Sequence, residues 1–353
     1  MSRVWRVAVA GLGHWYSAYN LARAMREYPK AVLVAVASRE THRRHEFAGA
    51  FGLPGYDTLA EMLDRERVDI VHIASPVSEI HDLTLQSAAA GKHLVLGKPM
   101  AMSVAEADRM VAAVDAAGIV CVPLQGIMRL RFAWLKARID AGEIGDVVVL
   151  HQASRWSIAE DWYRSGTPGW FADPRSVPGG ALIDEGIYWI DFFGWITGSE
   201  IVQVEAKVAN LVHKDIAVED WGLATFTTDT GVIATLEASW TINAPRKSGP
   251  SPKQNSVVRL EVVGSRGEII EQWFRAPGRA VLASGANDWV FERQPEEPFA
   301  VATPSPLDHL IGCLEQDRRP VATIHDARRS LAAALAAYES ARTGGPVRLS
   351  LPQ

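Results

Sequence analysis

Residues 7–16 read Val7-Ala8-Val9-Ala10-Gly11-Leu12-Gly13-His14-Trp15-Tyr16, an apolar run of strand length that enters a glycine-rich turn before a helical segment. Glycines in such a turn let the backbone approach a pyrophosphate, whose charge the following helix N-terminus stabilises. Tyr16 occupies the third glycine position of the GxGxxG fingerprint, so an ordinary tight turn is the alternative. Because the turn opens the first strand–helix unit of the chain, we favour dinucleotide binding. The predicted cofactor contacts here are Gly11, Gly13, His14 and Trp15.

Apolar runs of strand length alternate with amphipathic helical segments up to about residue 124. These runs are Val7–Ala10, Val32–Ala37, Ile70–Ala74, His93–Leu96 and Ile119–Val122. They lack the polar alternation of a half-exposed sheet, so they predict parallel strands buried on both faces. Helix starts are marked by Thr58 and by the capping box Ser103-x-x-Glu106, and a helix end by Gly118. Residues 1–124 are therefore predicted to form a doubly wound parallel sheet of the Rossmann type.

The second half of the chain, residues 125–353, is predicted to be an α+β domain. Its strand-like runs are Val147–Ala153, Val202–Val208, Leu223–Thr227, Val232–Ser239, Val257–Val263 and Glu268–Trp273. Hairpin-type turns at Asp229–Gly231 and Gly264–Gly267 indicate a mostly antiparallel sheet. The expected helices are Arg131–Ala141, Ala181–Trp195, Pro306–Gln316 and Asp326–Arg342.

Composition excludes several classes of protein. The chain has 353 residues, is 48% hydrophobic and carries a formal charge of −5, so we expect a soluble globular protein that does not bind nucleic acid. No apolar run approaches the roughly 20 residues of a membrane span. Cys121 and Cys313 lie far apart among apolar neighbours, which predicts reduced thiols and no metal site. We therefore expect a cytoplasmic protein with no signal peptide.

The end of the second predicted strand bears on which dinucleotide binds. An acidic residue about 20 positions beyond the fingerprint normally accepts a hydrogen bond from the ribose 2′-hydroxyl of NAD. Here Ser38 and Arg39 end the strand, and Arg43 follows, which are donors that suit a 2′-phosphate. We therefore favour NADP, with Ser38, Arg39 and Arg43 as contacts. Glu40 could instead bond the hydroxyls of NAD, which stays possible.

Lys98 and Pro99 follow the predicted strand His93–Leu96. Ligands bind at the carboxyl edge of an open parallel sheet, so Lys98 would face the nicotinamide, hold a substrate oxygen and relay its proton. The alternative is an ordinary surface lysine.

The predicted helix Ala181–Trp195 carries Asp184, Tyr188 and Asp191 at i, i+4 and i+7. This spacing puts three polar side chains on one face of an otherwise apolar helix, and burying them without a purpose is costly. They are candidates for a catalytic site. The alternative is a structural network in which the tyrosine hydroxyl satisfies a buried aspartate.

Taken in order along the chain, these motifs resemble the Gfo/Idh/MocA family. The resemblance also rests on Ala74-Ser75-Pro76 with His81 after it, on Gly142-Glu143-Ile144-Gly145, on the Gly179-Gly180 pair and on Ser340–Gly344, and it covers nearly the whole chain. It implies a Rossmann domain followed by a domain with a large open sheet that commonly forms dimer or tetramer contacts. It also implies cofactor contacts at Ser75, Pro76, His81, Lys98 and Pro99.

The resemblance assigns roles to three residues. The family's lysine falls on Lys98, its helix aspartate on Asp184, and its usual histidine on Tyr188, a tyrosine similar to those of glucose–fructose oxidoreductase and dihydrodiol dehydrogenase. It implies hydride transfer between a nicotinamide and a sugar, cyclitol or related secondary alcohol or ketone. Tyr188 would exchange the hydroxyl proton, best with Lys98 lowering its pKa, and Asp184 would orient both groups. Gly97 departs from the glutamate that usually precedes Lys-Pro in the family.

Two further possibilities follow from these residues. Gly97 and Tyr16 leave room for a dinucleotide-binding sensor of the same fold that catalyses nothing, and Tyr188 leaves room for an enzyme like dihydrodiol dehydrogenase. Trp156, Trp162 and Trp170 precede the candidate helix, where the family places substrate contacts, and could stack on a sugar ring. Most tryptophans are nevertheless core residues, so Trp156 and Trp170 are only candidates for substrate binding.

Overall fold

The computed structural model describes residues 3–158, 169–241, 257–273, 279–284, 289–293 and 305–350. The chain divides into two compact units. The first comprises Met1–Ile127 and Ala300–Arg328, and the second comprises Met128–Phe299 and Arg329–Gln353. Trp162 lies outside the described residues.

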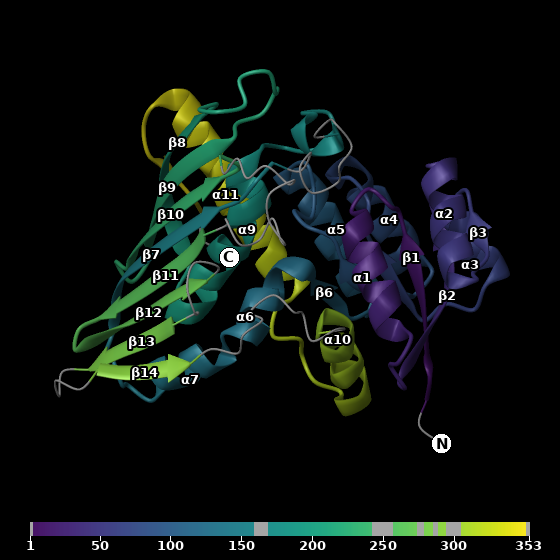
Figure 1. The fold of residues 1–353 in the computed structure, drawn as a ribbon, viewed down its shortest axis with the longest axis horizontal. Coiled ribbons are helices and arrows are strands. Elements are labelled where there is room, and N and C mark those ends of the chain that lie inside the picture. The colour runs from purple at the N-terminus through teal and green to yellow at the C-terminus, as the bar shows by residue number, and fades with distance from the viewer. Residues whose placement is uncertain are drawn as a thin grey trace, which may run out of the picture. The chain divides into compact units, whose positions relative to one another are not determined.

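The first unit is built on a six-stranded sheet in the order β3-β2-β1-β4-β5-β6, with every pairing parallel (Figure 1). The strands are β1 Trp5–Ala10, β2 Ala31–Ala37, β3 Gly55–Tyr56, β4 Ile70–Ile73, β5 His93–Leu96 and β6 Cys121–Pro123. The order and direction confirm the predicted doubly wound sheet. The strand order reverses between β1 and β4, which makes their carboxyl ends the switch point where ligands bind in such sheets.

Several helices of this unit begin at a side-chain cap or end at a glycine. They are α1 Trp15–Met25, α2 Thr41–Phe51, α3 Leu59–Arg65, α4 Val77–Ala89, α5 Val104–Ala117 and α10 Ser305–Gln316. Thr58 accepts the N–H of Glu61 at 3.2 Å, and Ser103 accepts that of Glu106 at 3.2 Å. Gly118 ends α5 at a φ of 61°, a left-handed conformation that favours glycine. The predicted helix ends at Thr58, Ser103 and Gly118 are confirmed.

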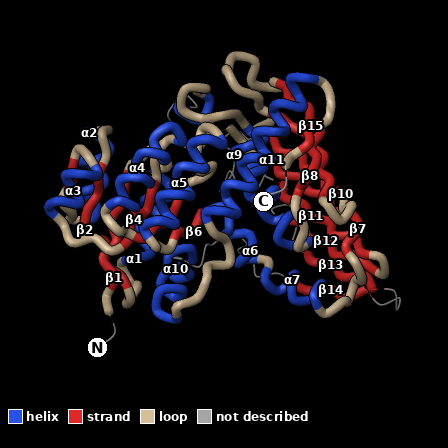
Figure 2. The backbone as a smooth tube through the Cα atoms, turned by 180° about the vertical axis from the view of Figure 1, so that it is seen from behind, coloured by secondary structure: helices blue, strands red, loops and turns tan. Residues whose placement is uncertain are grey.

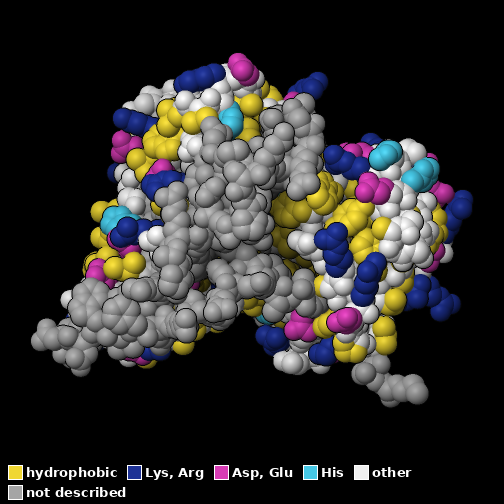
Figure 3. Space-filling view, in the orientation of Figure 1, with side chains coloured by type: hydrophobic (Ala, Val, Ile, Leu, Met, Phe, Trp, Pro, Cys, Tyr) yellow, Lys and Arg dark blue, Asp and Glu magenta, His cyan; other side chains and the backbone are white. Residues whose placement is uncertain are grey.

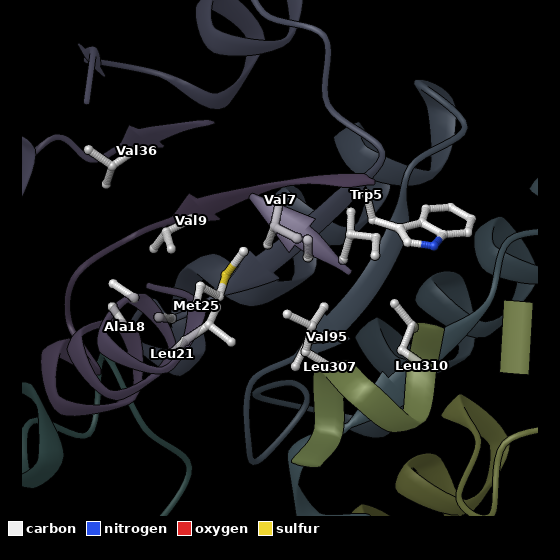
Figure 4. Packing of buried hydrophobic residues seen from close by; sticks show 14 of the residues in the cluster. Trp5, Val7, Val9, Ala18, Leu21, Met25, Val36, Val95, Leu307 and Leu310 are labelled. Carbon is white, nitrogen blue, oxygen red and sulfur yellow. The ribbon is translucent and has the colours of Figure 1, made fainter. Parts of the chain in front are cut away.

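The core of the first unit joins segments that are far apart in the sequence. Val7 and Val9 of β1 pack with Leu21 of α1, and Leu307 and Leu310 of α10 belong to the same buried cluster (Figure 4). Helix α10 falls within the predicted second domain, residues 125–353, whereas its apolar face packs in the core of the first unit. Burial of such side chains contributes about 1.5–3 kcal/mol each, which makes α10 an integral part of this unit.

The second unit contains a nine-stranded sheet in the order β14-β13-β12-β11-β7-β10-β9-β8-β15. The strands are β7 Val147–Arg155, β8 Ile201–Ala209, β9 Trp221–Thr228, β10 Ile233–Ser239, β11 Val257–Gly264, β12 Gly267–Trp273, β13 Arg279–Ser284, β14 Trp289–Arg293 and β15 Val347–Arg348. Among the described pairings, β7 with β10 is parallel and the others are antiparallel. The mostly antiparallel sheet and both predicted hairpin turns are confirmed.

The helices assigned to this half of the chain are α6 Ile127–Arg131, α7 Ala133–Asp140, α9 Ala181–Thr197 and α11 Ile324–Thr343, with a 3₁₀ turn η2 at Gly169–Ala172. Helices α9 and α11 lie along one face of the sheet (Figure 2). The helix predicted at Arg131–Ala141 is found as α7, which begins after the buried Phe132, and the short helix α6 before it was not predicted. Within the described residues, no helix has the length and apolarity to cross a membrane.

Small residues bring α9 close to the sheet. A Cβ at Gly222 of β9 would lie 2.7 Å from Leu182 Cβ, and one at Gly186 of α9 would lie 2.8 Å from Leu236 Cδ2 of β10. This close packing fixes the helix on the sheet, and the polar side chains of α9 are held with it.

Candidate functional site

The glycine-rich turn after β1 touches the turn after β4. Gly11 has a φ of +82°, and a Cβ there would lie 1.7 Å from Ser75 Oγ, while a Cβ at Gly13 would lie 2.5 Å from Pro76 Cδ. The two turns are also joined by the His14 N–H, which donates to the Ala74 carbonyl at 2.9 Å. Four predicted cofactor residues, Gly11, Gly13, Ser75 and Pro76, therefore meet at the switch point, although packing alone already requires both glycines.

The N-terminus of α1 suits a bound pyrophosphate. Helix α1, every residue of which is described, has no side-chain hydrogen bond at its N-cap and no acidic residue in its first turn. Helices α3 and α5, by contrast, have a side-chain cap and a glutamate in the first turn. Partial positive charge at a helix N-terminus attracts anions. Trp15 and Tyr16 are half-buried at this turn, and the Tyr16 ring lies edge-on to His14 at 5.5 Å.

Lys98 is buried at the carboxyl end of β5. It is 4% exposed and is followed by a cis bond to Pro99. Burial lowers the pKa of His14 well below its usual range, and the positive charge of the nearby Lys98 lowers it further. The alternative of an ordinary surface lysine is therefore wrong.

Close packing explains why position 97 holds a glycine and not the expected glutamate. A Cβ at this position would lie 3.0 Å from the Ile73 carbonyl oxygen and 3.0 Å from Ile80 Cδ1. The side chain of Ile80 from α4 occupies the space in which a longer residue would begin. The first unit therefore holds Lys98 without an acidic neighbour at position 97.

At the end of β2, two of the three residues predicted to bind a 2′-phosphate, Ser38 and Arg43, contact Glu40. Ser38 is buried, and its Oγ accepts the N–H of Glu40 at 3.2 Å, while Arg39 is exposed. Arg43 Nε pairs with Glu40 at 3.2 Å, and Arg43 Nη1 donates to the carbonyl of Leu12 in the glycine-rich turn at 3.3 Å. Arg43 thus links the end of β2 to the glycine-rich turn. Histidine, basic and acidic side chains lie close together around α2 in the space-filling view (Figure 3).

Two basic residues near this edge have protein partners. Arg44 is buried and pairs with Asp57 while donating to the Ser38 carbonyl, so it joins β2 to the segment after β3. His81 lies on α4, where its Nδ1 contacts Asp82 at 2.7 Å and its Nε2 accepts from Arg109 Nε at 3.1 Å. These bonds connect His81 to α5, and its predicted role at the cofactor stays a prediction.

Helix α9 carries the polar candidates of the second unit. Asp184 is buried, and its Oδ2 accepts from the indole Nε1 of Trp240 at 3.3 Å. Burial raises the pKa of Tyr188 well above its usual value, and the negative charges of Glu185 and Asp184 raise it further. The Tyr188 phenol is therefore protonated at neutral pH and can donate a hydrogen bond. The expectation that Lys98 lowers this pKa is not met, because burial and the two carboxylates move it in the opposite direction.

Asp191 belongs to a structural network. Its carboxylate receives Arg129 Nε at 2.7 Å, Arg129 Nη2 at 2.9 Å and the Ser330 hydroxyl at 3.3 Å, all of them buried. The three polar residues on one face of α9 therefore have different roles. Asp191 forms an internal ion pair with Arg129, and Asp184 and Tyr188 remain the candidates for catalysis. Asp191 therefore has a structural role, although its partners are Arg129 and Ser330 and not the tyrosine hydroxyl that the alternative named.

The tryptophans differ in exposure. Trp156 is 9% exposed beyond the end of β7, and Trp170 of η2 is half-buried and stacked on Phe171 with ring centres 3.9 Å apart. Two further residues beside the candidate group, Glu185 and Trp240, were not predicted from the sequence. Glu185 adjoins a candidate in sequence and could have been noticed, but Trp240 reaches Asp184 across 56 positions without any local motif.

Models of known protein families match residues in both units of the chain. A model of an oxidoreductase family with an NAD-binding Rossmann fold matches residues 5–124, and a model of the GFO/IDH/MocA C-terminal domain matches residues 132–270. The chain is 28% identical over 358 residues to scyllo-inositol 2-dehydrogenase (NAD(+)) of Bacillus subtilis (strain 168), covering 98% of this chain and 96% of the relative.

A second relative and a solved structure extend the likeness. Trans-1,2-dihydrobenzene-1,2-diol dehydrogenase of Mus musculus is 29% identical over 177 residues, covering 48% of this chain and 49% of that protein. The WlbA dehydrogenase from Bordetella pertussis, in complex with NADH and UDP-GlcNAcA, has the same fold with a TM-score of 0.82, 23% identity and 100% coverage of both chains. From its two matching domains, the chain belongs to the GFO/IDH/MocA family of oxidoreductases with an NAD-binding Rossmann fold.

Proposed function

We propose that this chain transfers a hydride between a nicotinamide dinucleotide and a hydroxyl-bearing carbon of a sugar, cyclitol or related secondary alcohol. The observation that carries the proposal is the burial of Lys98 at the carboxyl edge of the parallel sheet, beside the switch-point turns. Burying a charged amine costs free energy, so its placement at the edge of the sheet where ligands bind favours a functional role. The names of the inositol and dihydrodiol dehydrogenase relatives support this substrate class.

The cofactor would be held by the edge of the first unit. Gly11 and Gly13, with Ser75 and Pro76, would form the pyrophosphate turn at the N-terminus of α1. When bound, the nicotinamide ring supplies or accepts the hydride. We propose NADP as the preferred dinucleotide, because Arg39 is exposed and the Glu40 carboxylate, which would repel a 2′-phosphate, is paired with Arg43.

The chain's own residues would handle the oxygen and its proton. Lys98 would polarise the reacting oxygen, and the protonated phenol of Tyr188 would donate its proton during ketone reduction and recover one during alcohol oxidation. Asp184, held by Trp240, would orient these groups. Trp156 and Trp170 are proposed substrate contacts, for which the stacked ring of Trp170 offers an apolar face.

We also propose a cytoplasmic homodimer or homotetramer. The edge strands and the face of the nine-stranded sheet opposite α9 supply the surface that such an assembly would use. Light scattering coupled to size exclusion would measure the mass in solution directly.

The experiment that tests the proposed function is a scan for turnover. The purified protein is mixed with NAD⁺ or NADP⁺ and each of a panel of cyclitols, aldoses and aromatic trans-dihydrodiols, or with NADH or NADPH and the corresponding ketones, and absorbance is followed at the wavelength of the reduced nicotinamide. We expect turnover with at least one polyol and a higher kcat/KM for NADP⁺. Tight dinucleotide binding without turnover of any substrate, in either direction, would favour a sensor of the same fold.

A further inference from the structure

The first turn of α9 has its backbone N–H groups bound by two residues from distant parts of the second unit. In the stretch Gly180–Ile183, the N–H groups of residues 180 and 182 donate to the two carboxylate oxygens of Glu219 at 2.8 and 2.9 Å. The N–H of residue 181 donates to the Glu219 carbonyl at 3.0 Å, and that of residue 183 to the Tyr338 hydroxyl at 3.1 Å. The Tyr338 hydroxyl in turn donates to the Glu219 carboxylate at 2.7 Å.

This cap is charged and buried. Glu219 is 7% exposed, and burial raises its pKa, while the bonds from Tyr338 and from the backbone oppose that rise. A carboxylate at a helix N-terminus is favoured by the helix dipole, and unsatisfied N–H groups at a buried helix end are costly. The start of α9 is therefore fixed by the protein itself, and its N-terminus is already occupied by an internal anion.

The Gly179-Gly180 pair is explained by the same contact. A Cβ at Gly179 would lie 2.2 Å from the Tyr338 hydroxyl oxygen, and a Cβ at Gly180 would lie 2.0 Å from the Glu219 carbonyl oxygen. Larger residues would push the helix start away from its cap. The glycines thus serve the approach of Glu219 and Tyr338 to α9.

The cap is continuous with the support of Asp184. The Asp184 N–H makes the first helical bond, to the Gly180 carbonyl at 3.0 Å. Its carboxylate accepts from the indole Nε1 of Trp240, and the backbone N–H of Trp240 donates to the carbonyl of Asp220 at 2.7 Å. The neighbours Glu219 and Asp220 therefore hold the backbone of Asp184 through α9 and its carboxylate through Trp240.

We propose that Glu219, acting with Tyr338, is a positioning residue for hydride transfer, which fixes the first turn of α9 and thereby the places of Asp184 and Tyr188. The inference rests on the proposed function, since it assigns a purpose to the cap only if these two residues work on the substrate. A displacement of about 1 Å at a reacting group can cost roughly 100-fold in rate. Loosening the first turn should therefore lower kcat more than it changes cofactor affinity.

The test compares Tyr338→Phe and Glu219→Gln with a matched control, Tyr28→Phe. Tyr28 also donates its hydroxyl to a carboxylate, that of Asp308, but it does so in the first unit. For each variant we would measure kcat, KM, the Kd of the dinucleotide, and amide hydrogen exchange in the peptide that covers the start of α9. We expect Tyr338→Phe to lower kcat about 10- to 100-fold and to speed exchange in that peptide, with the dinucleotide Kd within about twofold of wild type.

The outcomes separate this inference from the function on which it rests. Faster exchange at the start of α9 with an unchanged kcat, in a wild-type background that turns over substrate, would overturn the positioning role alone. Absence of turnover in the wild-type protein would overturn the proposed function and this role together. If Glu219→Gln does not fold, Tyr338→Phe decides the question, since it removes one hydroxyl and leaves the carboxylate. An equal loss of kcat in Tyr28→Phe would also contradict the inference.

Discussion

Two aspartates on one face of α9 should respond in opposite ways to the same substitution. Asp191→Asn removes the charge that faces Arg129, whose side chain is 9% exposed and whose two nitrogens lie 2.7 and 2.9 Å from the carboxylate. Breaking a buried ion pair by removing one partner costs about 3–5 kcal/mol, because the remaining charge stays buried without compensation. Asp184→Asn keeps a side-chain oxygen that can accept the hydrogen bond from Trp240 Nε1, 3.3 Å away, so we expect a loss below about 1 kcal/mol.

The activities should follow the reverse order. Asp184→Asn should lower kcat about 100-fold per folded molecule, whereas Asp191→Asn should stay within about threefold of wild type. Urea unfolding followed by tryptophan fluorescence gives the free energies, and initial rates at a temperature where both variants are folded give kcat. Replacing the pair together, by Arg129→Met with Asp191→Leu, should recover most of the stability that Asp191→Asn loses.

Either of two results would contradict this difference between the two aspartates. A free energy of unfolding for Asp191→Asn within about 1 kcal/mol of wild type would mean that the ion pair with Arg129 is not the buried support described above. A kcat for Asp191→Asn that falls as far as that of Asp184→Asn would mean that Asp191 belongs to the catalytic group after all.

Three other perturbations test the first unit. Arg39→Ala should lower kcat/KM for NADP⁺ about 10-fold and leave that for NAD⁺ unchanged, because the exposed guanidinium would meet only the 2′-phosphate; equal losses with both would contradict the NADP assignment. Gly13→Ala, whose Cβ would lie 2.5 Å from the neighbouring turn, should weaken dinucleotide binding at least about 10-fold by titration, whereas Gly49→Ala, with open space around it, should bind normally. Burial lowers the pKa of His72 from 6.5 to about 4, so the unfolded chain takes up the proton first, and the native state should lose about 3 kcal/mol as pH falls from 7 to 4. Urea unfolding of His72→Gln should lack this slope, and a slope equal to that of wild type would show that His72 is not its source.

Local sequence signals predicted the elements well where the physical cause is itself local. Thr58 and Ser103 bind the backbone three residues on, and Gly118 ends its helix by its own conformation, so the sequence near each position was sufficient. The glycine-rich turn after β1 was likewise readable, although its contact with Ser75 and Pro76 shows that packing contributes to the same pattern.

Features that depend on contacts between distant segments were not predictable in this way. Helix α10 has an ordinary amphipathic pattern, which says that one face is buried but not that Leu307 joins the core of the first unit. The role of Asp191 depended on Arg129, 62 positions away, and spacing along α9 could not distinguish it from Asp184. The cap from Glu219 was invisible for the same reason, because its donors lie 37 and 39 positions earlier in the chain.

The most direct test of the proposed reaction follows a deuterium label from the reacting carbon of the substrate to C4 of the nicotinamide in wild type, Lys98→Ala, Tyr188→Phe and the double variant. We expect the label on C4 in wild type, rates lowered about 10²–10⁴-fold in each single variant with dinucleotide Kd unchanged, and a double variant little slower than the worse single one, as for residues that act as a unit. Label that never reaches C4, or losses of the two single variants that multiply in the double variant, would contradict a shared role of Lys98 and Tyr188 in hydride transfer.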